Sequence, residues 1–202
     1  MVTGFASTED LGEKQVSFDQ VGSGLYAYTA EGDPNSGVIV GDDAVMVIDA
    51  QPTPAMANDV IARVAQVTDK PIKYVLLTHY HAVRVLGASA FKGAEILASD
   101  ATGGLIAERG KENMNFAIAR FPRLFRSAET IPGLTWPTAT FPDQISVWLG
   151  RREVRVMHFR AVLSNTGQPV SAATLTSSIG LPRSTIWPNC RPPRWCLAAA
   201  LH

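Results

Sequence analysis

The sequence has little cysteine and no excess of charge of either sign. Its 202 residues include two cysteines, Cys190 and Cys196, and the five residues between them match no common zinc or redox spacing. Lysine and arginine number 18 together, as do aspartate and glutamate, so the formal net charge is zero. A neutral chain has no general attraction to nucleic acids or acidic membranes. We therefore expect no nucleic-acid partner.

Long apolar runs are also missing. No stretch approaches the roughly 20 apolar residues that a membrane-spanning helix needs. Residues 1–10 lack the basic region and apolar core of a signal peptide. These features favour a cytoplasmic chain without a membrane partner, long enough for one domain with a sizeable core. They do not specify an oligomeric state.

Short patterned segments predict an α/β fold. Helical spacing of apolar residues, with Thr53 as cap, predicts a helix up to residue 67, and further helices are expected over 86–91 and 102–120. A long irregular connection over 121–137 carries Trp136, a candidate to line a site. Apolar and alternating runs predict strands over residues 16–21, 25–29, 38–40, 44–48, 72–77, 95–98, 145–149 and 154–157.

A pair of histidines follows the most apolar of these strands. The strand over 72–77 runs into Thr78-His79-Tyr80-His81. Residues two apart in an extended chain point the same way, so His79 and His81 can direct both imidazoles at one point. Converging neutral imidazoles are the start of a zinc site. The alternative interpretation is a pair of satisfied polar residues at a strand end.

The context of these histidines resembles a known family. Gly41-Asp-Asp-Ala-Val-Met-Val-Ile-Asp49, then a helix, then Lys73-Tyr-Val-Leu-Leu-Thr-His-Tyr-His81 is similar to the N-terminal half of metallo-β-lactamase-fold hydrolases, over about residues 15–158. That superfamily carries His-x-His-x-Asp-His, whereas this chain has Val83 for the Asp and Arg84 for the last His. The resemblance implies an α/β, metallo-β-lactamase-like αββα sandwich, incomplete here, with an N-terminal half and an irregular tail.

The resemblance also implies roles for single residues. His79 and His81 would be zinc ligands, and Asp49 would support them from behind. Arg84 would oppose a second metal by repulsion, or hold a substrate carboxylate or a developing oxyanion. The alternatives are a loop acid before a helix for Asp49 and a simple ion pair for Arg84. With two ligands missing from the motif, we expect zinc to bind weakly or not at all.

The composition changes after residue 158. All 18 acidic residues lie at or before Glu153, and residues 159–202 contain no Asp, Glu or Lys. Ordinary domains are about one quarter charged. We therefore divide the chain into 1–158, the N-terminal part of a metallo-β-lactamase-like domain, and 159–202, an aberrant tail that is disordered or frame-shifted. If the reading frame is shifted back by one base, the codons for Trp187-Pro-Asn-Cys190 must encode Ala at position 188 and Leu at position 190. In the same shifted frame, the codons for residues 180–190 permit the pattern of an amphipathic helix.

Two functions are compatible with the sequence. The first is a zinc-dependent hydrolase of an ester, lactone, thioester or lactam, impaired in this chain, whose partner is a small molecule with a hydrolysable carbonyl. The second is a truncated, catalytically inactive fold that acts at most as a binding or interaction protein. In the family, a further His ligand comes from the second half. Here only His158 and His202 remain, and His158 is also explained as a polar strand end.

Overall fold

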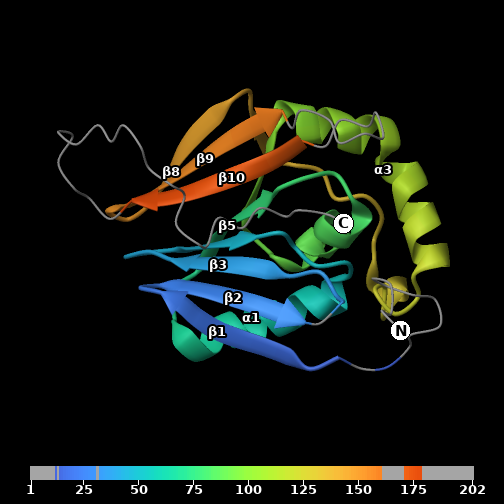
Figure 1. Cartoon of the computed structure of the whole chain (residues 1–202), viewed down its shortest axis with the longest axis horizontal. Helices are drawn as coiled ribbons and strands as arrows, with labels where there is room; N and C mark the ends of the chain where they lie inside the picture. The colour runs from blue at the N-terminus through green and yellow to red at the C-terminus, as the bar shows by residue number, and fades with distance from the viewer. Residues whose placement is uncertain (1–11, 13, 31, 161–170, 179–202) are drawn as a thin grey trace.

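A computed structural model describes residues 12, 14–30, 32–160 and 171–178 (Figure 1). The larger sheet contains β1 (Val16–Gly22), β2 (Leu25–Ala30), β3 (Ser36–Val40), β4 (Val45–Ile48), β5 (Ile72–Leu77), β6 (Glu95–Ser99) and β7 (Ala139–Phe141), adjacent in that order. The smaller sheet has the order β10-β9-β8 and contains β8 (Gln144–Leu149), β9 (Arg152–Arg160) and β10 (Ser171–Ser178). The helices are α1 (Pro54–Val67), α2 (Ala82–Val85) and α3 (Asp100–Arg120), with 3-10 turns η1 (Leu86–Ala90) and η2 (Ala128–Thr130).

Strand direction in the larger sheet follows from the connections. β1 to β4 pair antiparallel through short turns, whereas β4, β5, β6 and β7 pair parallel. Parallel neighbours need a longer crossover, which α1 supplies between β4 and β5 and α3 supplies between β6 and β7. The ends of β4, β5 and β6 therefore meet at one edge of the sheet.

α1 covers one face of the larger sheet. Its start is fixed by Thr53, whose Oγ1 accepts from the backbone N of Met56 at 3.2 Å, and by Pro54 in the first turn. Met56, Ala57, Val60 and Val64 form its buried face. This helix and its capping residue confirm the prediction from the sequence.

The smaller sheet covers the other face, as Figure 1 shows. Ile39, Met46 and Leu76 of the larger sheet pack in one cluster with buried side chains of β8 and β9, which are Val147, Leu149, Val154 and Val156. On β8 the burial alternates, and Trp148 between two buried neighbours is 57% exposed. Helix, sheet and sheet thus form successive layers, which confirms the predicted α/β, metallo-β-lactamase-like fold.

Three local features differ from the prediction. The residues after His81 form α2 and then the 3-10 turn η1, instead of one helix over 86–91. α3 begins two residues early because Ser99 Oγ accepts from the backbone N of Thr102 at 3.1 Å, which caps the helix. β7 was missed because three residues carry no periodic signal. None of the described helices is long and apolar enough to cross a membrane.

Part of the predicted tail belongs to the smaller sheet. β9 continues to Arg160, and the backbone of β10 pairs antiparallel with it along its whole length. Residues 161–170 and 179–202 lie outside the described residues, as do Cys190 and Cys196. The division of the chain at 158/159 and the frame shift stay predictions, which the coding DNA past Met157 can test.

Gly87 is the tightest backbone contact near the site, and it provides a stability test. A Cβ on Gly87 would collide with the backbone carbonyl oxygens of Ala50, Gln51 and Thr53. Gly87→Ala is expected to lower the free energy of unfolding by about 2–3 kcal/mol, because the colliding atoms are backbone. The matched change Gly104→Ala in α3, where a Cβ meets nothing within 4 Å, is expected to stabilise by about 0.5–1 kcal/mol. Urea unfolding measures both, and a neutral Gly87→Ala would contradict the described packing.

Candidate functional site

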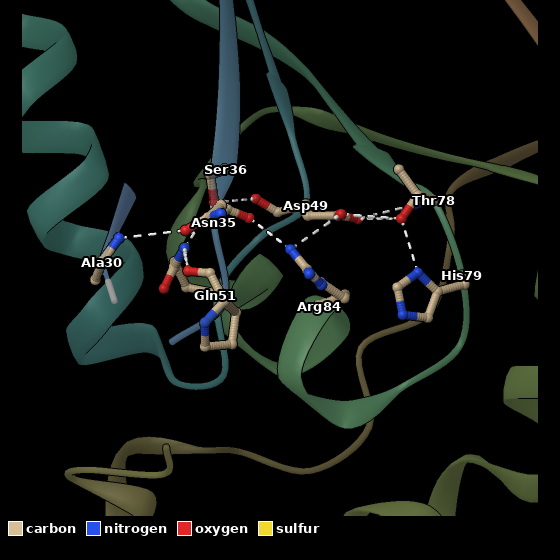
Figure 2. A network of polar contacts seen from close by, with 9 residues as sticks. Ala30, Asn35, Ser36, Asp49, Gln51, Thr78, His79 and Arg84 are labelled. Atoms are coloured by element: carbon tan, nitrogen blue, oxygen red, sulfur yellow. Dashed lines mark hydrogen bonds and ion pairs between the residues drawn. The ribbon is translucent and has the colours of Figure 1, made fainter. Parts of the chain in front are cut away.

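The candidate site lies where β4 and β5 end side by side. Ile48 of β4 is in register with Leu76 of β5, so Asp49 emerges next to Thr78 and His79 (Figure 2). The carboxyl ends of parallel strands are the usual place for ligand sites in α/β folds. The sequence predicted this juxtaposition, and the structure brings Asp49, His79 and Arg84 into one network of polar contacts.

Asp49 reaches His79 through Thr78. The Asp49 carboxylate accepts from the Thr78 backbone N at 2.9 Å and from Thr78 Oγ1 at 2.8 and 2.9 Å. Thr78 Oγ1 lies 2.8 Å from His79 Nδ1. The single hydroxyl proton goes to Asp49, so Nδ1 of His79 donates to Thr78 Oγ1. The Nε2 atom of His79 is therefore left with a free lone pair.

Thr78 is the residue that the sequence argument missed. Asp49 was expected to act directly behind the histidines, whereas the hydroxyl of Thr78 stands between Asp49 and His79. Its only sequence signal is its position, between the last apolar residue of β5 and His79.

Arg84 forms an ion pair with Asp49. Its Nη1 donates to the backbone O of Asn35 at 2.6 Å and lies 3.5 Å from Asp49 Oδ2. The two side chains are 16% and 6% exposed. Burial raises the pKa of the Asp49 carboxyl, against the opposite effects of Arg84 and of the Thr78 hydrogen bonds. The contact of Arg84 with Asp49 therefore agrees with the simple ion pair, one of the two interpretations of Arg84.

The backbone around Asp49 is held in an unusual conformation. Asp49 and Gln51 have φ of +61° and +69°, in the left-handed region that non-glycine residues rarely adopt. Ser36 Oγ donates to the Asp49 backbone O at 2.7 Å, and Gln51 Nε2 donates to Ser36 Oγ at 2.8 Å and to Pro34 O at 2.9 Å. These bonds hold the strained turn that directs the Asp49 carboxylate toward Thr78.

His79 and His81 lie close together and are neutral at pH 7. Their rings pack edge to face with 4.8 Å between centroids. Burial, followed by the charges of His81 and Arg84, lowers the pKa of His79 to about 3. Burial and then Arg84 also lower the pKa of His81. A neutral imidazole is the form that binds metal ions.

The described residues do not complete a catalytic zinc site, which uses three protein ligands. Nowhere in residues 12, 14–30, 32–160 and 171–178 do three His, Cys, Asp or Glu side chains come close enough to hold a metal ion. His158 therefore does not join His79 and His81. Its backbone N donates to Asp143 O at 2.7 Å, and both of its ring nitrogens are buried without a hydrogen-bond partner among the described residues.

A cavity of about 250 Å³ adjoins the two histidines. His79, His81 and Arg84 line it from the β5 end and α2, and Asn113 and Phe116 of α3 line it together with Phe121, which follows the helix. Trp136, which we expected at a site, is not among the lining residues and is 53% exposed.

A larger hollow of about 620 Å³ lies at the opposite ends of the strands. Its charged groups already have protein partners. Lys70 Nζ donates to Gly41 O at 2.7 Å, Arg152 Nη1 to Val40 O at 2.7 Å, and Arg151 Nε to Asp42 at 2.9 Å. We therefore place the candidate site at the smaller cavity, beside the histidines.

The fold and this strand-end network define a class of protein. The family model of the metallo-beta-lactamase superfamily matches residues 29–158, and the chain belongs to that superfamily. Its members are metal-dependent hydrolases as a class. No curated protein matches the sequence.

Solved structures show the same fold at low sequence identity. A metallo-beta-lactamase from Hirschia baltica aligns with a TM-score of 0.55 at 18% identity, covering 79% of this chain and 65% of that one. One from Pontibacter korlensis gives 0.58 at 14% identity, covering 81% and 67%. A HARLDQ motif mutant from Cronobacter sakazakii gives 0.53 at 20% identity, covering 80% and 59%. This chain thus spans about two thirds or less of their lengths.

Proposed function

We propose that this chain is an impaired zinc-dependent hydrolase of a small molecule with an ester, lactone, thioester or lactam carbonyl. The observation that carries the proposal is the ion pair of Arg84 with Asp49, beside two side chains able to bind a metal ion, His79 and His81, which no third such group joins within the part of the chain that the structure describes. In this class of enzyme a bound metal ion activates water and polarises the carbonyl. The described residues supply two of the three ligands that such a site requires.

The chain's own residues support only slow chemistry. The Asp49–Thr78 pair fixes the tautomer of His79, so its Nε2 can accept a hydrogen bond from water or substrate. However, a base is most effective when its pKa lies near the working pH, and that of His79 is lowered to about 3. General-base catalysis by this imidazole alone is therefore weak.

The second candidate is a binding protein without catalysis. The observation that favours it is the cavity itself, which needs no metal to exist and in which Arg84 is already bonded to Asn35 and Asp49. A screen of purified protein against ester, lactone, thioester and lactam substrates separates the two candidates. Slow turnover that depends on zinc and is lost in His81→Ala supports the hydrolase.

Zinc content is the direct test of the site. Purified and dialysed protein is expected to retain less than one equivalent of tightly bound zinc, because two imidazoles make an open, weak site. Elemental analysis measures it, with His81→Ala as the control that removes a ligand and His158→Ala as a matched change outside the site. A full equivalent that disappears in His81→Ala would contradict the impaired site. A full equivalent lost in both variants would identify His158 as the third ligand.

A further inference from the structure

The cavity beside the histidines is small and largely apolar. Phe116, Phe121 and Leu124 line it together with the two histidines. The two phenyl rings pack edge to face, with 6.2 Å between centroids and an angle of 85°. Its volume of about 250 Å³ lies below the roughly 300–1,000 Å³ of most small-molecule sites. It therefore suits a ligand of about one ring with a short polar group.

Asn113 lines this cavity and also a neighbouring hollow with Tyr80 and Arg109, and it carries a hydrogen-bond donor of fixed orientation. Its Oδ1 accepts from the backbone N of Ala82 at 2.8 Å, the first residue of α2. The N–H of Ala82 needs an acceptor, so the amide oxygen must face it and the Nδ2 group must point elsewhere. No hydrogen bond within the described part of the chain engages Nδ2. A ligand carbonyl oxygen is the acceptor that this donor fits.

The charges around the cavity disfavour an anionic ligand. Arg84 is the one permanently charged residue among the described residues that line it. Its Nη1 is bonded to Asn35 O, and the carboxylate of Asp49 lies 3.5 Å away and balances its charge. Arg84 Nε has no hydrogen-bond partner among the described residues, but it is buried, and Asp49 already balances the charge of the guanidinium. A ligand carboxylate would therefore lose its hydration against phenyl rings without an accessible, unbalanced cation in return, which is costly.

We propose that this cavity binds a small uncharged carbonyl compound with a planar apolar group. Asn113 Nδ2 donates to the carbonyl oxygen, and Phe116 and Phe121 pack against the apolar group. Phe116, 59% exposed, lies on the surface of α3 next to the bound ligand. The choice of a carbonyl compound rests on the proposed function, but binding itself requires neither zinc nor turnover. The cavity would thus select uncharged esters or lactones over substrates that carry a carboxylate.

The test uses phenylacetamide and phenylacetate, which have the same shape and differ in charge. Both are titrated into zinc-free wild-type protein at pH 7.5, and binding is followed by ligand-observed NMR and calorimetry. Phenylacetamide is expected to bind at least about fivefold more tightly than phenylacetate, because both can accept from Asn113 Nδ2 but only the carboxylate loses the hydration of a charge. No binding of phenylacetamide, or equal binding of both compounds, would overturn the proposal. Both titrations use zinc-free protein and involve no turnover, so failure here is distinct from failure of the hydrolase proposal.

Asn113→Asp then tests the donor. The carboxylate can still accept from the Ala82 N–H, but it removes the Nδ2 donor and adds a negative charge. Phenylacetamide binding is expected to weaken at least about fivefold. Asn115→Asp adds the same charge at an exposed position of the same helix and is expected to leave binding unchanged. An equal effect in both variants, or none in Asn113→Asp with its circular dichroism intact, would exclude Asn113 as the contact.

Discussion

Replacing Arg84 with methionine is expected to lower the free energy of unfolding at pH 7 by about 3–5 kcal/mol, the typical cost of removing one partner from a buried ion pair. The change leaves the Asp49 carboxylate buried, with only Thr78 to stabilise its charge. Methionine keeps most of the volume, so the loss of packing is small. Urea unfolding followed by circular dichroism measures the effect.

The pH dependence of this variant identifies the cause. Burial already raises the pKa of Asp49 in the folded protein, and Arg84 opposes that rise. Without Arg84, the folded-state pKa rises further above its unfolded value. A carboxyl with a raised folded-state pKa contributes stability at low pH that is lost as the pH rises through that pKa. The difference between Arg84→Met and wild type is therefore expected to shrink toward pH 4.

A double variant provides the control. Arg84→Met with Asp49→Asn removes both charges and keeps an oxygen that can accept from Thr78. It is expected to recover part of the lost stability, because an unpaired buried charge costs more than a neutral pair. A double variant less stable than Arg84→Met, or a loss independent of pH, would show that the charge of Asp49 is not the source of the effect.

His79 is expected to make the protein sensitive to acid. Burial lowers its folded-state pKa to about 3 from an ordinary value of 6.5, so the folded protein binds this proton less readily than the unfolded chain. Stability from this group is fully present above pH 6.5 and is lost as the pH falls toward 3. The loss is about 1.4 kcal/mol for each pH unit, up to roughly 4–5 kcal/mol in all.

His79→Asn isolates this contribution. The asparagine Nδ2 can replace Nδ1 as donor to Thr78 Oγ1, and the side chain does not titrate. Burial raises the pKa of the Asp49 carboxyl, so its protonation affects stability with the opposite sign, and both proteins contain Asp49. The informative quantity is therefore the difference in unfolding free energy between wild type and His79→Asn from pH 7 to pH 3.5. A difference that stays constant over this range would contradict a buried neutral His79.

The sequence predicted the secondary structure around the site because those elements depend on local signals. Strand periodicity, the Thr53 cap and the parallel crossover bring the ends of β4 and β5 together, and all three can be read from the chain. The position of Asp49 beside the histidines was an implication of the family resemblance. An ion pair of Arg84 with a nearby acid was one of two alternatives, and Asp49 was not named as that acid. The position of the Arg84 side chain depends on its hydrogen bond to the Asn35 carbonyl, which is 49 residues away in the chain.

Other features of the site had no local signal. The left-handed conformations of Asp49 and Gln51 are imposed by Ser36 and the Pro34 carbonyl, on a separate segment. Asn113 was not singled out because an isolated asparagine in a helix is unremarkable until Ala82 is placed next to it. Contacts between distant segments decide such details, and periodicity carries no information about them.

The seven strands of the larger sheet lie side by side in the order in which the ribosome makes them. Each strand therefore emerges next to a neighbour that is already synthesised, and the sheet can grow from one edge during translation. The sheet face that packs against β8 and β9 is covered much later. Ile39, Met46 and Leu76 stay uncovered until the covering residues of β8 and β9 have left the ribosome, and the first of these, Val147, comes about 70 residues after Leu76. During that interval the nascent chain presents an apolar sheet face, which is where a chaperone would be needed most.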